Sequence, residues 1–395
     1  MRISDVLSLH DLEPLARAHL PCPLFAYVSG AVEDGHAFAG NPRAYAGWAF
    51  APRVLAGVQQ RSTEVDLFGV RYAAPFGIAP MGLAAMVAYD GDRVIASAAH
   101  AANIPAIMSG ASLTRMEDVA AVAPRTWFQA YLPADDRLIG ETLARAREAG
   151  FPVLVVTVDC ACSANRENNI RAGYSTPLRP SPRLALQGLA RPRWLLGTLA
   201  RTLVSRGMPH FENLGHARGA PVLSRHAVRD FRPLDGLTWK HIETIRKLWP
   251  GKLVLKGVLQ TVDARLAASH GADGIIVSNH GGRQFDGAMA PLHALPEIAA
   301  DKRGLAVMID SGIRRGTDVL KALALGADFA FVGRPFLYAA AIGGRPCVGR
   351  AAGLLQAEID RNMALLGVSR PGQLDATWLR SIAGAHADAS SKISP

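Results

Sequence analysis

An imidazole and a guanidinium lie three residues apart, at His280 and Arg283, in the segment Ser278-Asn-His-Gly-Gly-Arg-Gln284. Imidazole has a pKa near neutrality and can accept a proton, whereas a guanidinium can bind a carboxylate through two parallel hydrogen bonds. The pattern favours a base beside a carboxylate clamp on a loop that two glycines loosen. The alternative is a histidine that ends a strand and only caps a loop.

Two further charged residues interrupt apolar runs. Asp159 ends Val153-Leu-Val-Val-Thr-Val-Asp159, and a buried carboxylate needs a partner. We expect that partner to be His280, whose ring Asp159 would orient and whose protonated form it would stabilise; taken by itself, Asp159 could equally cap a structural element. Lys256 lies in Leu253-Val-Leu-Lys-Gly257 and needs an electron-rich neighbour such as a reduced flavin. Schiff-base chemistry is the alternative for this lysine.

Glycine and arginine recur together in Asp310-Ser-Gly-Ile-Arg-Arg-Gly316 and in Val332-Gly-Arg334. Free backbone N–H groups and arginine charge at such loops bind phosphate in many barrels with unrelated chemistries. The two segments therefore predict a phosphorylated cofactor or substrate.

Eight short apolar runs, each followed by a helix-compatible stretch, must position these residues. They are residues 75–80, 104–109, 126–132, 153–159, 252–258, 274–280, 306–312 and 329–334. Eight such units predict an α/β fold, a (β/α)8 TIM barrel, whose strand ends converge on one mouth. The rival is an open doubly wound sheet, but its dinucleotide-binding form needs Gly-x-Gly-x-x-Gly, and no Gly-x-Gly occurs here.

The chain between the fourth and fifth runs is long: about ninety residues separate Asp159 from Lys252, where a short connection would suffice. We predict one domain over residues 1–395, with residues 177–236 as a basic loop inserted after strand four. The stretch from Arg179 to Arg232 holds ten arginines against two acids, a net +8 of the chain's +10.

This insertion is also apolar in part, which makes a membrane-binding segment one interpretation. Arginine attracts anionic lipid, and we expect Trp194, Leu195, Leu196 and Leu199 to enter the interface. The alternative is a mobile basic lid that never meets lipid. Nucleic acid is not an expected partner, because no nucleic-acid motif accompanies the arginines.

Composition narrows the class of protein. The chain is 49% hydrophobic and 19% charged, which is typical of a globular protein with a large core. Its four cysteines have neither metal-finger spacing nor the density of a disulfide scaffold, so we predict no metal site. The first residues lack the apolar core of a signal peptide, and we expect a cytoplasmic protein.

Taken together, the residues resemble the FMN-dependent family that oxidises L-2-hydroxy acids such as glycolate, lactate and mandelate. The similarity covers nearly the whole chain and is closest in character to the mandelate dehydrogenases. It rests on the His280 segment and, in the same order as in the family, on Leu255-Lys-Gly257, Asp310-Ser-Gly-Ile-Arg-Arg-Gly-Thr-Asp318 and Lys321-Ala-Leu-Ala-Leu-Gly-Ala327.

The resemblance implies a role for each site residue. His280 is the base with Asp159 behind it, Arg166 and Arg283 hold the substrate carboxylate, and Tyr27 and Tyr131 lie at the carboxylate and the reacting hydroxyl. Lys256 lies near flavin N1 and the C2 carbonyl. The other residues implied for FMN are Pro80, Met81 and Gly82 along the ring, Ser109, Gln129, Thr157 and Ser278 around it, and Asp310, Gly312, Arg314, Gly333 and Arg334 at the phosphate.

Two departures from the glycolate-type pattern enlarge the substrate pocket. Ala111 stands where those members carry tryptophan, and Gly82 stands where they carry alanine, which implies a bulky aromatic or long aliphatic substrate. The insertion resembles the membrane-anchoring segment of mandelate dehydrogenase through Arg191-Pro-Arg-Trp194 and Arg206-Gly-Met-Pro209. The resemblance thus implies a homotetrameric dehydrogenase at the inner face of the cytoplasmic membrane that passes electrons to a quinone.

Three alternatives stay open at this point. Within the family, the chain could be a soluble oxidase that uses oxygen, or an L-lactate dehydrogenase. Outside it, a flavin-free, phosphate-binding barrel lyase or aldolase would use Lys256. A noncatalytic binding module would have no need of His280 and its partners.

Overall fold

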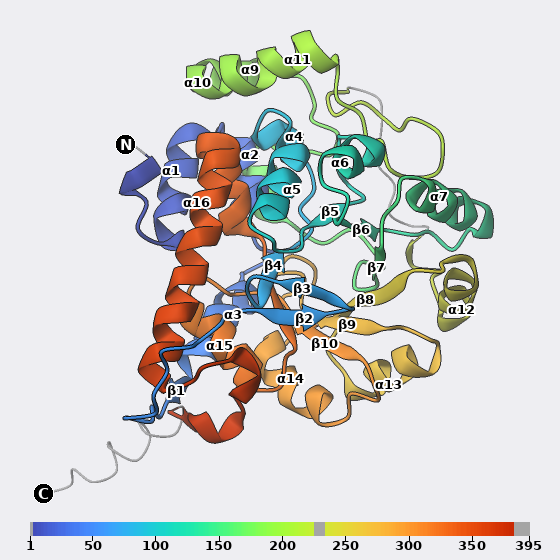
Figure 1. Ribbon diagram of the computed structural model, residues 1–395. Coiled ribbons are helices and arrows are strands. Elements are labelled where there is room, and N and C mark those ends of the chain that lie inside the picture. The colour runs from blue at the N-terminus through green and yellow to red at the C-terminus, as the bar shows by residue number, and fades with distance from the viewer. Residues whose placement is uncertain (1–2, 225–233, 383–395) are drawn as a thin grey trace, which may run out of the picture.

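The computed structural model describes residues 3–224 and 234–382, and its centre is a barrel of parallel strands (Figure 1). Eight strands are hydrogen-bonded in the order β4-β11-β10-β9-β8-β7-β6-β5. A parallel bridge between Ile78 in β4 and Ala106, just before β5, joins the two ends of this sheet. The predicted (β/α)8 barrel is confirmed.

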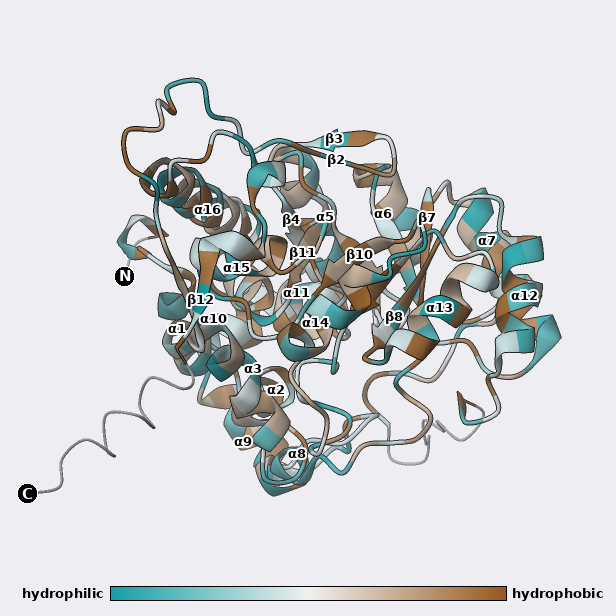
Figure 2. Cartoon of the chain, turned by 90° about the horizontal axis from the view of Figure 1, so that it is seen from below, coloured by the Kyte–Doolittle hydropathy of each residue, from teal (hydrophilic) through white to brown (hydrophobic). Residues whose placement is uncertain are grey.

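Each predicted apolar run contains one barrel strand. The strands are β4 (Phe76–Ile78), β5 (Ile107–Ser109), β6 (Trp127–Ala130), β7 (Val153–Thr157), β8 (Lys252–Val258), β9 (Gly274–Val277), β10 (Ala306–Ile309) and β11 (Phe329–Val332). The helices outside the insertion are α1 (Leu12–His19), α2 (Cys22–Ser29), α3 (His36–Ala46), α4 (Ala84–Val87), α5 (Gly91–Ala101), α6 (Met116–Val122), α7 (Asp136–Glu148), α12 (Trp239–Leu248), α13 (Thr261–Ser269), α14 (Pro291–Ala300), α15 (Gly316–Ala324) and α16 (Arg334–Leu366). Figure 2 shows hydrophobic strands inside helices whose outer residues are hydrophilic.

Two small sheets complete the fold. β1 (Trp48–Phe50) pairs antiparallel with β12 (Leu379–Ser381). The hairpin of β2 (Val65–Leu67) and β3 (Val70–Tyr72) packs against the barrel interior, where Leu67 and Tyr72 join a buried apolar cluster. The hairpin therefore closes the barrel at the end away from the carboxyl ends of its strands.

The barrel interior changes from apolar to polar along the strands. Side chains two apart on a strand face the same side. The lower inward positions form the buried apolar cluster and include Trp127, Val155, Val254, Ile276 and Met308. The next inward positions are Gln129, Thr157, Lys256, Ser278 and Asp310, all buried. The period of the strand thus places a polar layer at the barrel mouth.

The long connection after β7 begins with α8 (Glu167–Ala172), which precedes the predicted insertion at residues 177–236. It continues as a rod that lies across one end of the molecule (Figure 1). The rod consists of α9 (Pro182–Leu189), α10 (Pro192–Trp194), a π-helical stretch (Leu195–Ala200) and α11 (Arg201–Arg206). Residues 225–233 of the predicted 177–236 loop lie outside the described residues.

The expectation that Trp194 enters lipid is wrong. Its side chain is buried, and its indole N–H donates to the carbonyl oxygen of Met86 at 2.8 Å. Leu195 and Leu199 pack against the core, so of the four residues expected to face lipid only Leu196, 69% exposed, is free to do so. An apolar helical face packs equally well on protein or on lipid, and here tryptophan attaches the rod to α4.

The chain that returns from the rod is attached to the barrel at the neighbouring segment after β5. Asn213 is buried, accepts a hydrogen bond from the Met116 amide and donates to the carbonyl oxygens of Ser112 and Thr114. Arg145 on α7 donates to the carbonyl oxygens of Glu212 and Gly215. The described part of the insertion is therefore docked at both ends.

We predict that Trp194→Ala destabilises the protein by about 3–5 kcal/mol, because it removes a buried aromatic side chain and leaves a cavity. Thermal unfolding and limited proteolysis of the inserted segment measure the effect. Leu196→Ala on the same rod is the matched control and should change little. Equal behaviour of the two variants would contradict the docking of the rod through Trp194.

Candidate active site

A cavity of about 380 Å3 opens at the carboxyl ends of the barrel strands. Its lining includes most of the predicted site residues, namely Tyr27, Pro80, Met81, Gly82, Ala111, Tyr131, Thr157, Arg166, Lys256, His280, Arg283, Asp310, Gly312, Arg314, Gly333 and Arg334. The other four are hydrogen-bonded to each other or to lining residues: Asp159 to His280, Ser278 to Lys256, and Ser109 to Gln129. The structure therefore brings the whole predicted set together.

His280 and Asp159 form a half-buried pair, with 3.0 Å between Nδ1 and Oδ1. On the other side of the ring, Nε2 lies 3.4 Å from the Tyr131 hydroxyl. Burial lowers the pKa of His280, although Asp159 opposes this shift. Burial alone would raise the pKa of Asp159, but His280 and Lys256 outweigh it and hold that pKa below its usual value. A neutral imidazole beside a carboxylate is ready to accept a proton.

The backbone at His280 is unusual for a residue with a side chain, because its φ is +56°. The following Gly281 and Gly282 also have positive φ, at +69° and +71°. A left-handed backbone costs free energy for a residue with a Cβ. The Ser278 hydroxyl accepts a hydrogen bond from the His280 amide and helps to hold the turn that points the ring into the cavity.

Arginines give the cavity an excess of positive charge. Arg166 donates to the carbonyl oxygen of Arg283 at 3.0 Å, and Arg283 donates to that of Gly30 at 2.9 Å. Burial, and then the charge of Arg166, lower the pKa of Arg283 to about 10. Burial, and then Arg283 and Arg314, lower that of Arg334 to about 9. Buried like charges lower each other's pKa in this way when no anion lies between them, so the cavity is suited to anionic ligands.

Arg334 also makes protein contacts that the sequence did not indicate. Its guanidinium donates to the carbonyl oxygens of Val28, Gly30 and Gly281.

The loop after β10 is closely packed at Gly312, where φ is +84° and a Cβ would lie 2.8 Å from the backbone carbon of Asn41. Only glycine suits this position.

Lys256 lies at the centre of the polar layer. Its ammonium is 3.0 Å from Asp310 Oδ2 and donates to the Ser278 hydroxyl at 2.9 Å. Burial alone would lower the pKa of Lys256, but Asp310 and Asp159 outweigh it and raise the pKa. Lys256 is thus charged at neutral pH, which argues against its use as a Schiff-base nucleophile.

Two of the buried side-chain atoms that lack a hydrogen-bond partner among the described residues belong to the polar layer. They are Gln129 Nε2 and Thr157 Oγ1. An unsatisfied buried donor is costly and points to a ligand group. Both belong to the polar layer, where the edge of a flavin ring, with its carbonyl and N–H groups, would satisfy them. The residues present therefore fit FMN, with Arg314, Arg334 and the Gly312 loop available to its phosphate.

Gly82 and Ala111 are small residues of the cavity lining. A Cβ at Gly82 would lie only 3.0 Å from the Tyr27 hydroxyl and 3.1 Å from Ala111 Cβ, so a larger residue at this position would crowd both side chains. Sequence reasoning missed other lining residues, among them Cys160 and Tyr174. Tyr174 stacks on Tyr27 with ring centroids 4.8 Å apart. This contact joins the connection after β7 to α2, and no sequence pattern indicates it.

Comparisons with known proteins agree with this geometry. The profile of the FMN-dependent dehydrogenase family matches residues 16–381. An L-lactate dehydrogenase of Vibrio cholerae is 38% identical over 373 residues, covering 92% of this chain and 96% of that enzyme. An (S)-mandelate dehydrogenase of Pseudomonas putida is 34% identical, covering 95% of this chain and 94% of that one.

Solved structures give the same result. The crystal structure of the monotopic membrane protein (S)-mandelate dehydrogenase matches with a TM-score of 0.85 at 33% identity, covering 95% of this chain and 100% of that chain. A mandelate oxidase matches with a TM-score of 0.78 at 33% identity, covering 95% and 98%.

We predict that Gln129→Leu and Thr157→Val each weaken FMN binding about fivefold, since each removes one hydrogen bond worth ~1 kcal/mol. Fluorescence titration of the flavin-stripped protein measures this. Thr202→Val is the control, because Thr202 Oγ1 is also buried without a partner but lies in α11, away from the cavity. Equal affinity in all three variants and the parent would contradict this placement of the ring.

Proposed function

The chain belongs to the FMN-dependent dehydrogenase family, and we propose that it is one whose substrate is a bulky L-2-hydroxy acid. The protein is an FMN-dependent 2-hydroxy acid dehydrogenase. The observation that carries the finer proposal is the half-buried His280–Asp159 pair, which lies with a cluster of arginines at a cavity that the small residues Gly82 and Ala111 also line.

The arginines bind the substrate carboxylate. Arg166 and Arg283 line the cavity, and the Arg283 guanidinium lies 5.1 Å from the centre of the Tyr27 ring. A carboxylate between the two guanidiniums separates their charges and accepts charge-assisted hydrogen bonds. The Tyr27 hydroxyl, beside Gly82, is available to the same carboxylate. This clamp fixes the α carbon of the substrate relative to His280.

His280 removes a proton from the substrate at Nε2, the nitrogen that faces Tyr131. Asp159 accepts a hydrogen bond from the Nδ1–H group and stabilises the imidazolium. Burial keeps the Tyr131 hydroxyl protonated by raising its pKa well above the usual value, so it can donate to the developing oxygen charge of the product. FMN, when bound, accepts two electrons and hydrogen from the substrate. Lys256 supplies positive charge in the polar layer, and this charge would stabilise the negative charge of the reduced flavin.

The small residues Gly82 and Ala111 in the cavity lining support a substrate with a large substituent on the α carbon. This substituent would be aromatic, as in mandelate, or long and aliphatic. Leu83, Ile170 and Tyr174 add apolar surface to the same cavity. Small substrates such as glycolate would leave much of this surface unfilled and bind more weakly.

The experiment that tests the proposal is anaerobic mixing of the FMN-loaded protein with (S)-mandelate, a long-chain 2-hydroxy acid, L-lactate and glycolate. We expect bleaching of the flavin band, fastest with the two bulky acids. Preference for L-lactate would retain the family reaction and remove the argument from pocket size. No bleaching by any 2-hydroxy acid would overturn the function itself.

We predict that His280→Ala reduces the rate of flavin bleaching by more than 1,000-fold while FMN stays bound, because general-base catalysis typically contributes 10²–10⁴-fold. Stopped-flow absorbance follows the reduction. His293→Ala, an exposed histidine on α14, is the control and should reduce normally. Near-normal bleaching in His280→Ala would exclude His280 as the base.

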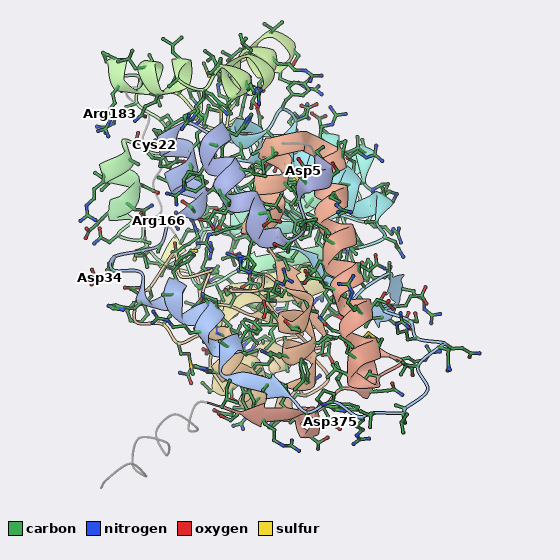
Figure 3. All side chains as sticks on the ribbon, turned by 90° about the vertical axis from the view of Figure 1, so that its left-hand side faces the viewer. Asp5, Cys22, Asp34, Arg166, Arg183 and Asp375 are labelled. Carbon is green, nitrogen blue, oxygen red and sulfur yellow. The ribbon has the colours of Figure 1, made fainter. Side chains whose placement is uncertain are left out.

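We further propose that the inserted rod binds an anionic membrane surface and that a quinone takes the electrons. The solved relative is a monotopic membrane protein, and no described helix of this chain is long and apolar enough to cross a bilayer. The rod exposes apolar side chains at Leu186, Leu189, Leu196, Leu203 and Val204. Arginines of the rod, including Arg183 (Figure 3), supply positive charge on the same element.

This placement supports contact at the inner face of the cytoplasmic membrane and access for a lipid-soluble acceptor. Mixing the reduced protein with a quinone or with oxygen distinguishes a dehydrogenase from an oxidase. Faster reoxidation of the flavin by the quinone identifies a dehydrogenase, and faster reoxidation by oxygen identifies an oxidase. The homotetramer that the resemblance implies stays a prediction, which sedimentation in detergent would test.

We predict that Leu186→Glu, Leu196→Glu and Val204→Glu each weaken binding to phosphatidylglycerol vesicles about tenfold or more. Each replaces an apolar contact worth ~1.5–3 kcal/mol with a charge that anionic lipid repels. Leu365→Glu is the control, since Leu365 is 67% exposed. It belongs to the C-terminal end of α16, and this end of the helix lies far from the rod (Figure 1). Vesicle sedimentation that ranks all four variants alike would discard the membrane proposal.

A further inference from the structure

Cys160 adds a thiol to the pair formed by His280 and Asp159, and the oxidation of a hydroxy acid gives this thiol no role. Its Sγ lies 3.4 Å from Asp159 Oδ1 and 3.5 Å from His280 Nδ1, and these two atoms are 3.0 Å apart. One sulfur, one nitrogen and one oxygen thus form a compact triangle, in which Cys160 is buried.

The triangle has the dimensions of a zinc site. Tetrahedral zinc takes sulfur at ~2.3 Å and nitrogen or oxygen at ~2.0–2.1 Å, which separates the ligand atoms by roughly 3.3–3.6 Å. The observed separations require only a slight widening between Asp159 and His280. Zinc sites with only three protein ligands, the arrangement typical of catalytic zinc, leave a fourth position for water or substrate, and here Cys160 and His280 both line the cavity.

A second observation also points to a ligand at this place. Asp159 Oδ2 is buried and has no hydrogen-bond partner among the described residues. The nearby charge of Lys256 would repel a cation, but Asp310 at 3.0 Å neutralises it. The carboxylate therefore has an unused oxygen beside a thiol and an imidazole.

We propose that Asp159, Cys160 and His280 form an inhibitory site for a thiophilic divalent cation, Zn²⁺ or Cd²⁺. Thiolate and imidazole ligands select these ions over Mg²⁺ and Ca²⁺, which prefer oxygen. On binding, the S–H bond of Cys160 breaks, its proton passes to solvent and a metal–sulfur bond forms. The His280 proton moves from Nδ1 to Nε2 through solvent, so that Nδ1 can bind the metal, and no oxidation state changes.

The bound ion stops turnover through the groups it holds. It takes the Nδ1 lone pair of His280 and separates this atom from Asp159, so that the carboxylate no longer stabilises the protonated ring. A metal-bound imidazole is also a poorer base, because the cation withdraws electron density from it. The loss of activity rests on the proposed function, whereas the binding of the ion does not.

Equilibrium binding to the FMN-loaded protein without substrate tests the site. Calorimetric titration with ZnCl2 should reveal one tight ion per chain, and Cd²⁺ should produce the ultraviolet absorption of a cadmium–thiolate bond. Cys160→Val should weaken this binding at least 100-fold and abolish the absorption. Cys162→Ser, which changes another thiol of the cavity lining, should leave both unchanged.

Several outcomes would overturn the proposal. They are unchanged zinc affinity in Cys160→Val, loss of the absorption in Cys162→Ser, or binding only to a site without a thiol. The cluster of exposed Asp34, exposed His36 and buried Asp286 is such a site, and it would give no cadmium–thiolate band. Cys160→Ser keeps the size of the side chain and replaces the valine variant if that fails to fold.

A separate arm links the ion to activity. Zinc should inhibit flavin bleaching by the preferred hydroxy acid, a chelator should restore it, and excess hydroxy acid should raise the zinc concentration required. Tight zinc binding in a protein that no hydroxy acid bleaches would retain the site and remove the proposed function. Bleaching that zinc does not affect would retain the function and remove the inhibitory role.

Discussion

Unbalanced positive charge governs the cavity. Arg166, Arg283, Arg314 and Arg334 all line it, and the pKa values of three of them are lowered by burial and, for Arg283 and Arg334, by other arginines. The nearby carboxylates are already engaged, Asp310 with Lys256 and Asp159 with His280. Protein groups alone therefore do not neutralise these arginines. Two anions, a phosphate and a carboxylate, would do so, and the folded state gains stability whenever either one binds.

The barrel meets this constraint through the period of its strands. Because side chains two apart face the same way, strands β5 to β10 each carry an apolar residue into the interior and then a polar residue to the mouth, as Val155 and Thr157 do on β7. Close turns at Gly312 and around His280 then bring loops against this layer. The apolar interior gives rigidity, and the loops supply the charged groups.

Much of this arrangement could be predicted from the sequence. The ends of parallel strands must meet at one mouth, so polar residues at those ends, such as Asp159 and Lys256, were correctly expected to lie close together. Other contacts depend on geometry that no local pattern contains. Trp194 in an arginine-rich helix is compatible with burial in lipid or in protein, and only the fold places it against Met86. The stacking of Tyr174 on Tyr27 likewise joins segments far apart in the chain.

The attachment of the returning chain has a consequence for how such proteins diversify. Asn213 binds the backbone at Ser112 and Thr114, immediately beyond Ala111 in the substrate pocket. The insertion is therefore no detachable module, because the segment that begins with the rod ends by fixing one wall of the pocket. A graft that exchanges this segment between family members would carry part of the donor's substrate preference with it, and selection on where the protein resides would also act on what it oxidises.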